Sequence, residues 1–77
     1  MIIEKNIDKI DKILNDKNVV EFKIYGLRYR IEKKDNYTIY PINDNNRKKS
    51  FNSLDELFKK YEIYNENLKD NDNKIKL

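Results

Sequence analysis

The sequence contains no histidine, no cysteine and no tryptophan, and its single glycine is Gly26. Without histidine and cysteine, the chain cannot form a Ser-His-Asp or Cys-His catalytic group, a zinc site built on those ligands, or a redox-active thiol. One glycine is also too few for the phosphate-binding loops that need several glycines at fixed spacing. These absences predict a protein that is not an enzyme and that uses no metal and no cofactor.

The length of 77 residues corresponds to one small domain that cannot be stabilised by a disulfide. Residues 1–5 carry charges where a signal peptide would be apolar, and no apolar run approaches the length of a membrane span. We therefore expect a soluble, cytoplasmic protein that does not associate with membranes.

An amphipathic helix is expected near the N-terminus, over residues 3–16. Four apolar residues recur there at helical spacing: Ile3, Ile7, Ile10 and Leu14. Asn15 and Asn18 are suited to the left-handed conformation that ends many helices. The apolar stripe is expected to pack into the core.

Residues 19–42 instead alternate between apolar and polar side chains, as strands do. A turn at Tyr25-Gly26 pairs every apolar residue of the first strand with one of the second: Val20 with Ile31, Phe22 with Tyr29, and Ile24 with Leu27. A second turn, with Asn36 left-handed, leads into a third strand that places Ile39 opposite Ile31. Pro41 lacks an N–H group, so this third strand is expected at the edge of a three-stranded antiparallel meander.

A second helix is expected to begin after a polar loop at 43–50. Ser53 and Glu56 form the capping-box pattern of a helix start. The apolar face of this helix comprises Leu54, Leu57, Phe58 and Tyr61. The predicted fold is therefore a small two-layer α+β domain over residues 1–69, followed by a polar, frayed tail at 70–77.

A resemblance to known proteins rests on three groups of residues. They are Phe22-x-Ile24-Tyr25-Gly26-x-x-Tyr29-x-Ile31, then Tyr37-x-Ile39, then Ser53-Leu54-Asp55-Glu56-Leu57 with Tyr61 and Leu68-Lys69-Asp70. Over residues 19–70 this pattern is similar to that of short uncharacterised proteins of low-GC Gram-positive bacteria and their phages. The resemblance implies an α+β fold and carries no activity with it.

Positive charge is concentrated in the middle of the chain. Residues 19–49 have a net charge of +4, whereas the whole chain has +3. The expected strand register places Lys23 beside Arg28, and both Glu21 and Tyr40 beside Arg30, on the sheet face that the helices leave uncovered. A basic sheet face with an exposed ring is typical of proteins that bind single-stranded nucleic acid. The other interpretation is a solvated face with an ordinary Glu21–Arg30 pair, because one tyrosine offers little stacking surface.

The polar loop adds a compact basic tripeptide, which is either a phosphate contact or a solvated run of charge. The candidate residues for binding a protein partner or a polyanion are therefore Lys23, Arg28, Arg30, Tyr40, Arg47, Lys48 and Lys49.

Two classes of function remain. The first is a small protein-binding regulator or inhibitor that acts on a host or cognate protein. Its specific form would be a protein encoded by a phage or mobile element that inhibits a host defence complex. The alternative is a small nucleic-acid-binding module that uses the basic sheet face. In addition, the first strand, 19–25, has one unpaired edge, which would accept a strand from a target protein or from a second copy in a homodimer.

Overall fold

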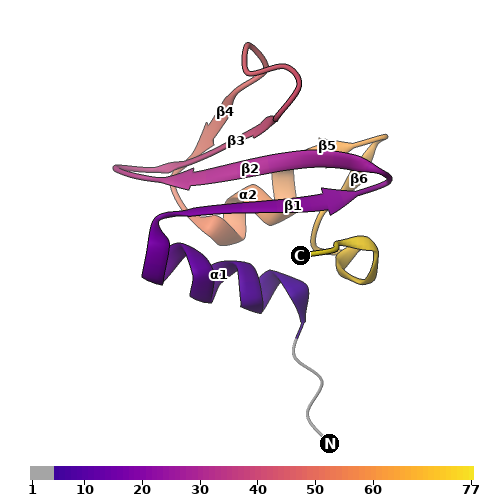
Figure 1. Cartoon of the computed structure of the whole chain (residues 1–77). Coiled ribbons are helices and arrows are strands. Elements are labelled where there is room, and N and C mark those ends of the chain that lie inside the picture. The colour runs from indigo at the N-terminus through magenta and orange to yellow at the C-terminus, as the bar shows by residue number, and fades with distance from the viewer. Residues whose placement is uncertain (1–4) are drawn as a thin grey trace, which may run out of the picture.

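The computed structural model describes residues 5–77 and shows an α+β fold (Figure 1). Its elements are α1 (Asn6–Lys17), β1 (Val19–Ile24), β2 (Leu27–Lys33), β3 (Tyr37–Pro41), β4 (Lys49–Phe51), α2 (Leu54–Lys60), β5 (Glu62–Ile63), β6 (Glu66–Asn67) and a 3₁₀ helix η1 (Asp72–Lys74). Strands β1 to β4 form one antiparallel sheet in sequence order, and β5 and β6 form a separate hairpin.

Both helices lie on the same side of the four-stranded sheet (Figure 1). Ile10 of α1 and Leu57 of α2 are completely buried in one cluster with Ile31 and Ile39 of the sheet. The opposite face of the sheet, which we call the outer sheet face, is left without a covering helix. The two layers expected from the sequence are therefore present.

The strand register agrees with the pattern of apolar residues. Val20 lies opposite Ile31, Phe22 opposite Tyr29, and Ile31 opposite Ile39. The turn between β1 and β2 requires two residues with positive φ, and these are Tyr25 (54°) and Gly26 (75°). A left-handed conformation is unfavourable for a tyrosine, so this turn is strained at Tyr25.

The ends of the two helices follow the expected chemistry. Helix α1 ends at Asn18, which is left-handed (φ 64°) and donates its N–H to the carbonyl of Leu14. Helix α2 begins after Ser53, whose Oγ accepts the N–H of Glu56 at 3.1 Å. The Glu56 carboxylate pairs instead with Lys60, one turn further along, at 3.2 Å. The expected start of α1 at Ile3 lies outside the described residues.

The sheet has a fourth strand where the sequence predicted only a loop. Strand β4 pairs with β3, placing Phe51 opposite Tyr37 and Ser50 opposite Thr38, whose hydroxyls lie 2.9 Å apart. The expectation that β3 is the outermost strand is therefore wrong. Pro41 is accommodated because the β3–β4 pairing stops at Ile39 and does not need its missing N–H.

Two finer expectations about the meander are also wrong. Asn36 is not among the residues with positive φ, and the turn is closed by a bond from the N–H of Lys34 to the carbonyl of Asn36 at 3.0 Å. Leu27 was expected in the core but is 37% exposed. It is the first residue of β2, beside the turn, and the first two residues of that strand are both exposed.

The C-terminal residues form an ordered part of the fold, which corrects the prediction of a frayed tail at 70–77. Ile75 is only 3% exposed. The Asp72 carboxylate accepts the N–H groups of Asn6 (3.1 Å) and Ile7 (2.7 Å), so it caps the start of α1 from the far end of the sequence. The Asn6 side chain donates in return to the carbonyls of Asp72 and Ile75.

The same segment covers part of the edge of β1. Lys23 and Lys76 exchange two backbone hydrogen bonds, of 2.8 and 2.7 Å. Figure 1 shows the yellow C-terminal segment between the start of α1 and the end of β1. The expected free edge along the whole of 19–25 is therefore wrong for its second half. Within residues 5–77, the part of this edge that begins at Val19 has no partner strand.

Candidate binding surface on the outer sheet face

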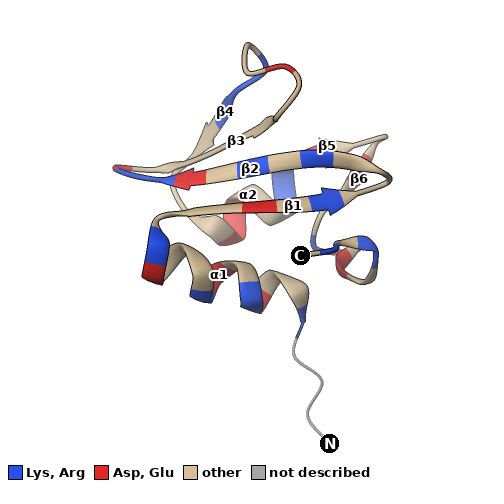
Figure 2. Ribbon diagram, in the orientation of Figure 1, with Lys and Arg blue, Asp and Glu red and all other residues tan. Residues whose placement is uncertain are grey.

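The register brings the four candidate residues of the sheet onto the outer sheet face. Lys23 lies opposite Arg28, and Arg30 lies between Glu21 of β1 and Tyr40 of β3. Strands β1 and β2 each carry charges of both signs (Figure 2). The face is therefore of mixed charge and not uniformly basic.

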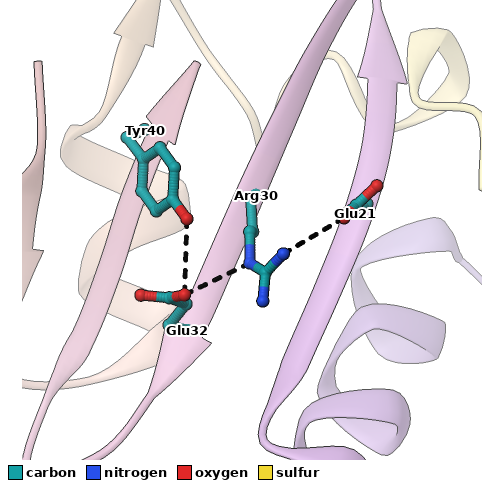
Figure 3. A network of polar contacts seen from close by, with 4 residues as sticks. All are labelled: Glu21, Arg30, Glu32 and Tyr40. Carbon is teal, nitrogen blue, oxygen red and sulfur yellow. Dashed lines mark hydrogen bonds and ion pairs between the residues drawn. The ribbon is translucent and has the colours of Figure 1, made fainter. Parts of the chain in front are cut away.

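Arg30 is the centre of a polar network (Figure 3). Its Nη1 lies 3.3 Å from Oε2 of Glu21, and its Nε lies 3.2 Å from Oε2 of Glu32. The hydroxyl of Tyr40 donates to the same Glu32 oxygen at 3.3 Å. We call Glu21, Arg30, Glu32 and Tyr40 the arginine network.

The arginine network carries a net negative charge, because two carboxylates contact one guanidinium. The Arg30 side chain is 36% exposed, and its Nε is shielded from solvent without making a hydrogen bond. The contact of Nε with Glu32 is thus an ion pair whose geometry is not that of a hydrogen bond. A phosphate approaching Arg30 would meet both carboxylates, which disfavours binding of a polyanion here.

Tyr40 is held on both sides by charged neighbours. Partial burial, followed by the Glu32 carboxylate, raises the pKa of the Tyr40 phenol, so it stays a neutral hydrogen-bond donor at physiological pH. The ammonium of Lys48 lies 5.0 Å from the centroid of the Tyr40 ring, a cation–π contact. These contacts hold the Tyr40 ring between Lys48 of the β3–β4 loop and Glu32 of β2.

Sequence reasoning found the Glu21–Arg30 pair and missed the role of Glu32. The signal was available, because residues two apart in a strand share a face and Glu32 follows Arg30 at that spacing. Tyr40 lies opposite Arg30, so Glu32 is its diagonal neighbour, within reach of a long side chain.

The basic tripeptide of the loop does not act as one unit. Lys48 contacts Tyr40, whereas Lys49 lies opposite Ile39 and places its ammonium 5.9 Å from the centroid of Tyr61. Of the seven candidate residues, five thus lie together on the outer sheet face, whereas Arg47 and Lys49 line a second location, which Lys48 also borders.

The comparison of this chain with protein-family models, with curated proteins and with solved structures finds no match. Within residues 5–77, no three acidic side chains gather as the ligands of a metal ion would. Neither helix of that same range has the length and apolar character needed to cross a bilayer.

The free energy of unfolding is expected to fall as the pH rises above about 10, because four phenols titrate later in the folded protein than their ordinary value of 10.0. Burial is the main cause of the raised pKa of Tyr29, Tyr40 and Tyr61, and a hydrogen bond to Glu66 is the main cause for Tyr25. A group with a raised folded pKa stabilises the fold fully below its unfolded pKa and loses that contribution as the pH passes its folded pKa.

Urea midpoints measured at a series of pH values, together with tyrosinate absorbance, check this expectation. The urea midpoint should stay constant from about pH 6 to 9, because no type of side chain in this sequence has its ordinary pKa in that range. A double variant, Tyr29→Phe with Tyr61→Phe, should weaken the alkaline decline. A urea midpoint that begins to fall well below pH 9 would contradict the assignment of the alkaline loss of stability to these phenols.

Proposed function

We propose that this protein is a non-enzymatic binding protein that contacts another protein through its outer sheet face. The observation that carries the proposal is the arginine network on a sheet face that no helix covers. The network presents an arginine and a tyrosine, two of the residue types that dominate binding energy in protein interfaces.

The geometry favours a protein partner over a polyanion on this face. Arg30 is already neutralised by two carboxylates, and Lys23 and Arg28 add positive charge only at one end of the face. A partner surface with charges of both signs matches this arrangement better than a row of phosphates does. Because Arg30 and Tyr40 are held by their neighbours before binding, less side-chain entropy is lost when the complex forms.

Within this class we propose a regulator or inhibitor that binds one target, on the basis of the small size of the chain and its lack of histidine and cysteine. The resemblance to short proteins of low-GC Gram-positive bacteria and their phages, and not a contact in the structure, is the basis for our narrower proposal that the target belongs to a host defence complex. The unpaired part of the β1 edge, at Val19, offers a second contact point to a target strand or to a second copy of this chain.

The double variant Arg30→Gln with Tyr40→Ser is expected to abolish capture of the partner from host lysate, with an affinity loss of about 30-fold or more, as for residues that dominate an interface. Its melting temperature should fall only modestly, because the ion pairs of Arg30 lie on an open sheet face and such surface pairs contribute only about 0–1 kcal/mol. Capture by affinity-tagged protein, followed by binding measurements on the purified partner, tests this.

The matched control is Lys9→Gln, which removes one exposed positive charge from α1, on the other side of the molecule. It should retain the partner as the unaltered protein does. Nuclease treatment of the lysate should leave capture unchanged. If nuclease releases the partner, or if the double variant retains it fully, the outer sheet face is not the protein-binding surface.

A further inference from the structure

A second surface, separate from the arginine network, lies where the β3–β4 loop meets the start of β5. It is a hollow of about 320 Å³ lined by Asn46, Arg47, Lys48, Lys49, Tyr61 and Glu62. We call it the loop hollow. The loop that forms one wall projects beyond the rest of the sheet (Figure 1).

The loop hollow is positively charged. It is lined by three cations and one carboxylate, that of Glu62. Across residues 5–77, no carboxylate lies within ion-pairing distance of Arg47, Lys48 or Lys49. The nearby Asp44 carboxylate accepts the backbone N–H of Asn46. The cations of the loop hollow therefore differ from Arg30, whose guanidinium already contacts two carboxylates.

Tyr61 supplies an uncommitted donor to the same hollow. The residue is only 7% exposed, yet its hydroxyl makes no hydrogen bond within the described part of the chain and keeps contact with solvent. Edge-to-face contacts with Tyr29 (6.2 Å) and Phe51 (6.5 Å) hold its ring in place. Burial, followed by the neighbouring Tyr29 phenol, raises the pKa of the Tyr61 phenol, and the Arg47 guanidinium, which lines the same hollow, partly offsets that rise.

An exposed aromatic ring lies close to this cationic site. Tyr64 is 69% exposed and forms the β5–β6 turn with Asn65, and both residues are left-handed (φ 55° and 64°). The ring packs edge-to-face on Tyr25 at 5.4 Å, so one ring is fixed while much of its surface stays open. Strand β5 is only two residues long, so Tyr64 follows three residues after Tyr61, which lines the loop hollow.

We propose that the loop hollow and Tyr64 together bind single-stranded nucleic acid. Arg47 and Lys49 contact a backbone phosphate in the loop hollow, the Tyr61 hydroxyl donates to it, and a base stacks on Tyr64. Such sites combine cations that follow the backbone with rings on which unpaired bases stack. A free phosphate ion would use the cations and gain nothing from Tyr64, and a duplex would hide the base faces that a ring contacts.

The test is fluorescence anisotropy of a labelled oligothymidylate of about ten nucleotides, titrated with the full chain at several salt concentrations. With Arg47 and Lys49 engaged, the logarithm of the association constant should fall with the logarithm of salt concentration with a slope of about −1.4. The double variant Arg47→Gln with Lys49→Gln should reduce the size of that slope by about 1.4.

The matched control, Lys23→Gln with Arg28→Gln, removes the same charge from the outer sheet face. It should leave binding close to that of the unaltered protein, and so should the Arg30→Gln, Tyr40→Ser variant. The two proposals therefore fail independently of one another. If the control pair weakens binding as much as the loop pair does, the oligonucleotide is held by general charge and the proposed site is wrong.

Tyr64→Asn tests the stacking step without endangering the fold, because asparagine is well tolerated in the left-handed turn. It should weaken oligonucleotide binding about 5- to 150-fold and leave the salt slope unchanged. If Tyr64→Asn has no effect while inorganic phosphate displaces the oligonucleotide, the loop hollow is a site for a free oxyanion. If an unlabelled duplex competes as well as the single strand does, recognition of single strands is excluded.

Discussion

Removal of residues 71–77 is expected to unfold most of the domain, although their polar sequence resembles that of a dispensable tail. The deletion exposes the site in which Ile75 is buried and removes the Asp72 carboxylate from the N–H groups of Asn6 and Ile7. Loss of a buried isoleucine costs about 2–5 kcal/mol and loss of a helix cap about 0.5–2 kcal/mol. A domain of this length has only about 4–12 kcal/mol in total. Circular dichroism and urea unfolding of the truncated chain measure the effect.

Point variants separate the two causes within the same segment. Ile75→Ala should lower the free energy of unfolding by about 2–5 kcal/mol, and Asp72→Ala by about 0.5–2 kcal/mol. Leu77→Ala is the matched control, since Leu77 is 53% exposed, and it should change stability by less than about 0.5 kcal/mol. A truncated chain that melts like the intact one would show that the C-terminal segment does not hold α1 in place.

Phe22→Ala and Leu57→Ala are each expected to cost about 2–5 kcal/mol, a large part of the stability of so small a domain. Phe22 is 2% exposed and stacks on Tyr29 with ring centroids 5.8 Å apart, and Leu57 of α2 is completely buried. Either change leaves a cavity between the sheet and the helices that the surrounding side chains cannot fill without strain. Urea midpoints provide the measurement.

Leu27→Ala is the control for the core variants, because Leu27 lies in the same alternating pattern but is 37% exposed. It should cost clearly less than either core variant, about 1 kcal/mol or below, because most of its apolar surface is not buried. Equal losses for Leu27→Ala and Phe22→Ala would contradict the described position of the core.

The two hairpin turns show how far local sequence chemistry reaches. Tyr25-Gly26 and Tyr64-Asn65 follow an isoleucine in both hairpins, and both tyrosines are left-handed at nearly the same φ, 54° and 55°. The first turn was predicted because Gly26 supplies positive φ and the flanking residues alternate. The sequence does not predict the second turn, because two-residue strands are too short to show any alternation.

For the candidate surfaces, too, the sequence predicts one part and only the structure shows the other. Period-two spacing was enough to place Arg30, Tyr40 and Lys23 on one face of the sheet. The same spacing places Glu32 on this face as well, but only the structure shows that Glu32 shares Arg30 with Glu21, which makes the face one of mixed charge. The loop hollow depends on Tyr61, which was expected only as part of a helix face.

The sequence by itself determined the elements whose physics is local. Apolar periodicity predicted the two helices and the pairing of β1 to β3, and Asn18, Gly26 and Ser53 supplied the conformations and caps that begin or end them. Only the tertiary structure decided the rest: β4, the capping of α1 by Asp72, and the approach of the β3–β4 loop to Tyr61. The hydrogen bonds from Asn6 and Ile7 to Asp72 span 65 or 66 residues, and a local pattern contains no information about a partner so distant. Such contacts form because the assembled core brings their residues together, and short polar segments with no periodicity of their own take whatever structure those contacts allow.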